Sequence, residues 1–137
     1  MNRADFQVLA DIRIAEAQQL LAAGLYDGAY HLAGYAVECA LKACIARLTN
    51  QYDFPDKEFL LACYTHAVEK LVNVAGLAAD RDRDAPVGSV LAANWKVAGN
   101  WSEGSRYVRK TAAEAQALVQ AVADPSNGVL QWIKARW

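Results

Sequence analysis

The 137-residue chain lacks the features that mark membrane and secreted proteins. It has no run of about 18 apolar residues, so the sequence predicts no transmembrane helix. The N-terminal stretch MNRADFQVLADIRIAEAQ is interrupted by charges and has no apolar segment of the kind found in signal peptides. We therefore expect a cytoplasmic protein with no membrane as partner.

An excess of basic residues and a disulfide pattern are absent as well. The formal net charge of -1 argues against a generic polyanion binder, although a local basic patch is compatible with it. The three cysteines, Cys39, Cys44 and Cys63, form no CxxC pair and no zinc-type spacing with histidine. Because Cys39 and Cys44 fall within a helical apolar pattern, we predict that they are buried, reduced thiols.

Common cofactor motifs are missing too. No Walker loop, GxGxxG or GxSxG element occurs. A metal site would require His31, Glu38 and His66, with Glu103, to converge, and nothing in their spacing requires this. We predict neither a metal ion nor a cofactor.

What is present is a helical composition: 55% hydrophobic residues, 21% charged residues and only 3 prolines. The length suits one domain spanning residues 1–137. Apolar spacing predicts helices over residues 5–23 and 26–48, and the short turn at Gly24 predicts that they form an antiparallel hairpin.

Further helices are expected over residues 57–74, bent near Tyr64 and Thr65, and over residues 87–97, 108–123 and 129–137. The polar segment DRDRDAP, residues 80–86, and the Gly-rich and Ser-rich residues 98–107 are expected to be loops. No strand pattern appears. The sequence predicts an all-α fold, an up-and-down bundle of four main helices plus one or two short ones.

One polar stripe runs along the predicted helix 26–48. His31, Tyr35, Glu38 and Lys42 are separated by four, three and four residues, which places them on one helix face. Glu38 and Lys42 have the favourable order for an ion pair. The pair is either exposed at the surface or part of a buried network that reaches His66 or the arginine of the SRY sequence, and a catalytic role is the third alternative. His66 itself suits a structural residue or a proton carrier.

A second candidate site is the segment that contains Trp95, Trp101, Arg106 and Tyr107. Aromatic rings beside an arginine can stack on bases and bind phosphate. The same residues can instead close the open end of a bundle, with each indole or phenol forming one hydrogen bond. Trp132 and Trp137 are expected either at a dimer surface or against the domain's own core.

Four segments together resemble the HEPN family of prokaryotic helical proteins: LAAGLYDGAYHLAGYAVECALKACI, YTHAVEKL, NWSEGSRY and GVLQWI. The resemblance spans about residues 10–132, and its most specific part starts at Gly24. It implies a bundle of four main helices that often forms a homodimer. Many members are RNases of toxin-antitoxin, CRISPR-linked or other defence systems, whereas others bind nucleotides or act as partners of minimal nucleotidyltransferases.

The RNase members of that family carry an arginine followed, after four to six residues, by a histidine. Only His31 and His66 could supply the histidine, and neither is preceded by arginine at that distance. No histidine follows Arg106 or Arg109. RNase activity by the family mechanism is therefore not expected.

Three functions follow as hypotheses. The first is a non-catalytic HEPN-type binding or partner module, dimeric, that binds nucleotide or RNA or pairs with a nucleotidyltransferase-like protein. The second is a divergent RNase or other enzyme that uses Glu38, Lys42, His66 and Arg106. The third is a structural dimeric scaffold. The residues expected to form a ligand site or polar network are Tyr35, Glu38, Lys42, His66, Trp101, Arg106 and Tyr107.

Overall fold

The computed structural model describes all residues, 1–137, and contains helices and no strands. Its elements in chain order are α1 (Arg3–Ala22), α2 (Tyr26–Arg47), α3 (Lys57–Cys63), α4 (Val68–Val74), α5 (Ala78–Asp84), α6 (Val90–Gly99), the 3-10 helix η1 (Glu103–Tyr107), α7 (Ala112–Ala123) and α8 (Val129–Lys134). The predicted all-α class is confirmed, with more short helices than the sequence suggested. No helix has both the length and the apolar character needed to cross a membrane.

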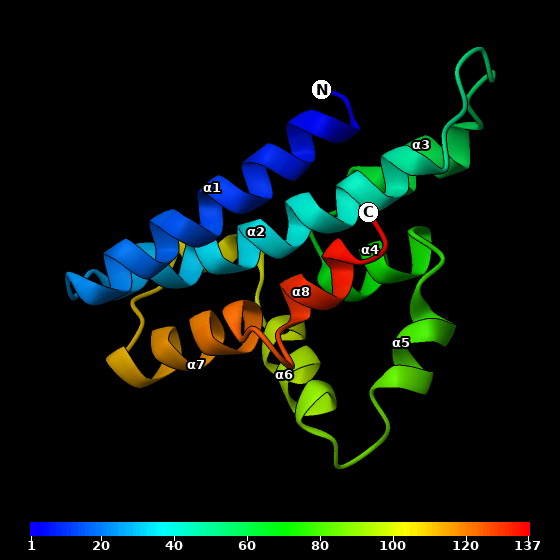
Figure 1. Cartoon of the computed structure of the whole chain (residues 1–137). Helices are drawn as coiled ribbons and strands as arrows, with labels where there is room; N and C mark the ends of the chain where they lie inside the picture. The colour runs from blue at the N-terminus through cyan, green and yellow to red at the C-terminus, as the bar shows by residue number, and fades with distance from the viewer.

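The two longest helices form the predicted antiparallel hairpin (Figure 1). Helix α1 begins with a capping box in which Asn2 and Asp5 exchange side-chain to backbone hydrogen bonds. It ends at Gly24, whose φ of 76° lies in the left-handed region that glycine adopts without strain. The N–H of Leu25 then donates to the carbonyl of Leu20, which completes a helix-ending motif and turns the chain into α2.

Helix α2 is the central element of the fold. Most of its residues are buried, many of them alanine, because α1, α7, α8, α4 and η1 all pack against it. Small side chains allow these neighbours to approach closely. In Figure 1, α6, α7 and α8 lie below the hairpin, and α3, α4 and α5 lie at the end where α2 finishes.

Two expectations about the middle of the chain need correction. The predicted helix over residues 57–74 is two helices, α3 and α4, separated by residues 64–67. The predicted loop over residues 80–86 is mostly helix α5. Contacts from distant residues stabilise α5, because Arg81 pairs with Glu69 at 2.7 Å and Asp84 accepts a hydrogen bond from the indole of Trp132.

The last third of the chain also differs in detail from the expected boundaries. Helix α6 starts at Val90, after the cap residue Ser89, and runs to Gly99, beyond the predicted end. Helix α7 starts at Ala112 with a Thr111–Glu114 capping box, so residues 108–111 are not helical. The expected loop 98–107 contains η1.

Trp132 packs against the domain's own core rather than on an outer surface. Its ring meets Trp95 edge-on at 5.6 Å between centroids, and the guanidinium of Arg136 lies 3.7 Å from its centroid. At the chain ends, Arg3 donates to the main-chain oxygen of Trp137. The Trp95 contact joins α8 to α6, and the Arg3 contact joins the C-terminal residue to the start of α1.

Candidate functional site

Helix α2 buries one carboxylate in the middle of its apolar face. The side chain of Glu38 is only 3% exposed. A buried carboxylate loses hydration worth several kcal/mol and needs charged or hydrogen-bonding partners to remain ionised. The polar stripe of α2 therefore marks an interior network rather than a surface pair.

Two groups contact the same oxygen of Glu38. Lys42 Nζ donates to Oε1 at 2.8 Å from one helical turn later, and His66 Nδ1 lies 2.9 Å from Oε1. His66 belongs to the short connection between α3 and α4, so its contact with Glu38 ties that connection to α2. The second oxygen, Oε2, is buried and has no hydrogen-bond partner.

The chain of contacts continues from His66 to the surface. His66 Nε2 lies 3.2 Å from Oε2 of Glu103, and Oε1 of Glu103 lies 3.4 Å from Nη2 of Arg106. The side chains of His66, Glu103 and Arg106 are 43%, 38% and 48% exposed. Arg106 in turn lies over the ring of Tyr107, 4.9 Å from its centroid, and Tyr107 is largely exposed. We call Lys42, Glu38, His66, Glu103 and Arg106 the ionic chain.

Trp101 does not lie on this surface, so of its two predicted roles stacking on a ligand here is wrong. It is 2% exposed and packs against Gly34 of α2, where no side chain separates the indole from the helix backbone. Its Nε1 has no partner, so the hydrogen bond expected for an indole that closes the bundle is absent. Trp101 instead anchors the segment that leads into η1.

His31 and Tyr35 lie beside the ionic chain without joining it. Their rings are nearly parallel, with centroids 6.3 Å apart, and His31 Nδ1 lies 3.4 Å from Oγ of Ser105. Burial, followed by the nearby Arg106 guanidinium, lowers the pKa of His31 below its ordinary value. Burial raises the pKa of Tyr35. In this environment the neutral form of each ring is favoured.

The cysteines form no part of the ionic chain. All three are free, and Cys39 and Cys44 are buried as predicted. Burial raises the pKa of each of these two thiols to about 11, so neither carries a thiolate near neutral pH. No group of three His, Cys, Asp or Glu side chains is arranged to hold a metal ion.

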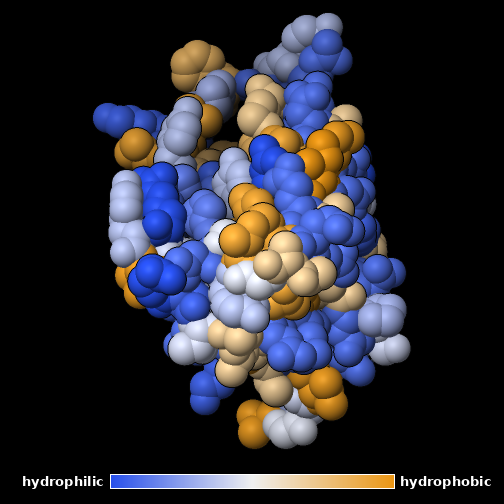
Figure 2. Space-filling model, turned by 90° about the vertical axis from the view of Figure 1, so that its left-hand side faces the viewer, coloured by the Kyte–Doolittle hydropathy of each residue, from blue (hydrophilic) through white to orange (hydrophobic).

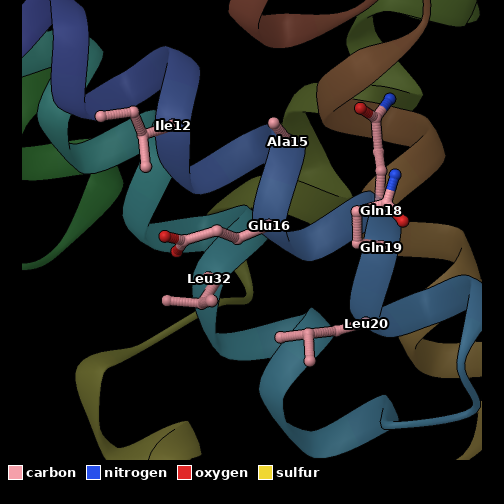
Figure 3. A pocket seen from close by; sticks show the side chains of 7 residues that line it. All are labelled: Ile12, Ala15, Glu16, Gln18, Gln19, Leu20 and Leu32. Atoms are coloured by element: carbon pink, nitrogen blue, oxygen red, sulfur yellow. The ribbon is translucent and has the colours of Figure 1, made fainter.

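A separate apolar groove lies between α1 and the start of α2. It has a volume of about 620 Å³, and Ile12, Ala15, Leu20 and Leu32 supply its apolar lining. Figure 3 shows the side chains that line the groove, all of them from α1 except Leu32, which comes from α2. Figure 2 shows that the apolar side chains on one face of the molecule form separate patches between hydrophilic ones. The groove contains no residue of the ionic chain.

At its exposed end, the ionic chain has one half-exposed imidazole, of His66, and one half-exposed guanidinium, of Arg106, and both contact the carboxylate of Glu103. A guanidinium can hold a phosphate or carboxylate, and a histidine held by a buried carboxylate can bind an anion or move a proton. The sequence found four of the five residues. Glu103 enters the sequence analysis only as one of the residues that a metal site would need beside Glu38 and His66, and its spacing of three residues from Arg106 is the signal for their ion pair.

Comparison with family models, with curated proteins and with solved structures finds no match for this chain.

Proposed function

We propose that this chain is a HEPN-type binding module, without catalytic activity, that binds a nucleotide or RNA on the face formed by His66, Arg106 and Tyr107. One observation carries the proposal: the ionic chain that starts at buried Glu38 ends at the surface in a guanidinium stacked on an exposed phenol ring. Guanidinium groups recognise phosphate with paired donors, and aromatic rings stack on bases. A ligand that carries a phosphate beside a base matches both groups.

The sequence resemblance supports the same function, since HEPN proteins without the RNase motif include nucleotide binders and partner proteins. It also makes a homodimer, and pairing with a nucleotidyltransferase-like protein in a toxin-antitoxin or defence context, part of the proposal. Sedimentation equilibrium of the purified chain tests the dimer. Co-purification with a nucleotidyltransferase encoded beside it tests the pairing.

The binding test uses calorimetric titration of the protein with AMP and with a short single-stranded RNA. R106A and Y107A should each weaken binding by about tenfold, as expected when a charge-assisted or stacking contact is lost. R83A and Y52A are matched controls, because Arg83 and Tyr52 are also exposed and lie outside the ionic chain. If the wild-type protein binds neither ligand, the proposed function is wrong.

One observation favours a second candidate, a divergent RNase or other enzyme. Buried Glu38 holds Nδ1 of His66 at 2.9 Å, and Nε2 of the same ring faces the half-exposed carboxylate of Glu103. A buried carboxylate that orients an imidazole in this way is an arrangement suited to general acid-base catalysis. Lys42 and Arg106 would then stabilise developing negative charge.

The two candidates separate in one assay. If the chain is an enzyme, the wild type cleaves a labelled RNA, and H66N abolishes cleavage while RNA binding is kept. If it is a binding module, neither protein cleaves. The third hypothesis, a scaffold alone, predicts that neither AMP nor RNA raises the melting temperature, whereas a ligand of the native state must raise it.

A further inference from the structure

Glu103 occupies the position between the two surface groups that would hold an anion. Its two oxygens face different partners, His66 Nε2 at 3.2 Å and Arg106 Nη2 at 3.4 Å. His66 comes from the α3–α4 connection and Arg106 from η1, so the carboxylate bridges two separate segments. An anion bound between an imidazole and a guanidinium would take this position.

We propose that the Glu103 carboxylate is an internal placeholder that a terminal phosphate group displaces when a ligand binds, so that Glu103 regulates access to the site. This inference rests on the proposed function and assigns the ligand group, a phosphate monoester. A monoester carries more negative charge than a carboxylate and offers three oxygens as acceptors. It can therefore satisfy both His66 and Arg106 in place of Glu103.

The contacts of Glu103 suit exchange. Both are longer than the 2.8 Å and 2.9 Å contacts of Glu38, and all three side chains involved are between 38% and 48% exposed. Exposed ion pairs of this kind contribute little stability, because water and salt screen them. An incoming anion thus replaces a weak contact.

The groups that would receive the phosphate each have a contact besides the one with Glu103. Nδ1 of His66 is held by the buried carboxylate of Glu38, and the guanidinium of Arg106 lies against Tyr107. Trp101 anchors the start of the segment in the core, and Ser105, which is buried, holds η1 near His31. The Glu103 side chain can therefore rotate outward while the donors remain in place.

Charge favours the same conclusion. With Glu103 in place, the two carboxylates of the ionic chain are matched by two basic side chains, Lys42 and Arg106, so the site has no excess positive charge to attract a phosphate. Removing one carboxylate leaves one net positive charge. We expect E103Q, and likewise E103A, to bind AMP about tenfold more tightly than the wild type, since an unfavourable like charge is removed.

The experiment is calorimetric titration of the wild type, E103Q and E103A with AMP, adenosine and inorganic phosphate. D53N is the charge-matched control, because Asp53 lies in the loop between α2 and α3 that projects from the domain (Figure 1). Tighter binding of AMP by both Glu103 variants, no gain for adenosine and no gain in D53N support the proposal. If the Glu103 variants gain as much affinity for inorganic phosphate as for AMP, the site recognises the phosphate group alone, and this result also supports the displacement of Glu103.

Two results would overturn it, and they are distinguishable. If the wild type binds AMP and the Glu103 variants bind it equally or more weakly, Glu103 is a ligand-binding or neutral residue and only this inference fails. If neither the wild type nor the variants bind AMP or phosphate, the proposed function fails together with it. Because Glu103 is half-exposed, the variants should fold, and an unchanged melting temperature checks this.

Discussion

The contact between Gly34 and Trp101 predicts the effect of a single methyl group. A Cβ atom at residue 34 would overlap Cγ, Cδ1 and Cδ2 of the buried indole, far inside the normal carbon-carbon contact of about 3.5–4.0 Å. Replacing glycine by alanine within a helix should gain about 1 kcal/mol. Overpacking a core costs about 1–3 kcal/mol or more, and because a whole ring must move here we expect a cost of about 2–3 kcal/mol. We therefore expect G34A to destabilise the protein by about 1–2 kcal/mol net.

Thermal unfolding followed by circular dichroism measures this effect. For a domain of this size, about 1–2 kcal/mol corresponds to a melting temperature lower by about 3–8 °C. G99A is the matched control, since a Cβ there meets only the Glu69 side chain, whose nearest atom, Oε1, is 3.4 Å away, and we expect no loss of stability. A G34A protein as stable as the wild type, or more stable, would refute the claim that the indole packs directly on the backbone of α2.

Three further predictions concern titration, thiol reactivity and helix capping. Burial, and then a neighbouring guanidinium, lowers the pKa of His31 below its ordinary 6.5, so the contribution of the neutral ring to stability is complete above that pH and is lost as the pH falls through the lowered value. The melting temperature should therefore fall as the pH is lowered below 6.5, and H31Q should make this fall less steep. An equal dependence of melting temperature on pH in both proteins would contradict the prediction. Iodoacetamide at pH 8 should modify Cys63 before Cys39 and Cys44 in the folded protein, as mass spectrometry of peptides can measure, whereas equal rates would refute the burial of the latter two. T111A should lower the free energy of unfolding in urea by about 0.5–2 kcal/mol through loss of the α7 cap, and an unchanged midpoint would contradict this role.

The parts of the fold that the sequence predicts well depend on local patterns. The α1–α2 hairpin follows from the apolar spacing within each helix and from the turn at Gly24. Each of these signals lies within a few residues of the helix or turn that it predicts. Helix α5 has no apolar pattern of its own. Its stability depends on contacts with Glu69 and Trp132, which are far away in sequence, so the polar segment looked like a loop.

The same difference applies to the candidate site. The Glu38–Lys42 pair can be predicted from its spacing of four residues, whereas the contact of Glu103 with His66 joins positions that only the fold brings together. For Trp101 the sequence allows both a ligand-stacking residue and a residue that closes the end of the bundle. Its burial depends on the absence of a side chain at Gly34, a distant residue whose role no local pattern reveals.

The most direct test of the central claim is an NMR titration of isotope-labelled protein with AMP, followed through the side-chain N–H signals of Arg106 and the imidazole signals of His66. Phosphate binding between His66 and Arg106 predicts saturable shifts at these two side chains and at the backbone of η1. It also predicts unchanged signals from the apolar groove around Ile12 and Leu32. Shifts confined to that groove, or no shifts at all, would contradict a phosphate-binding face at His66 and Arg106.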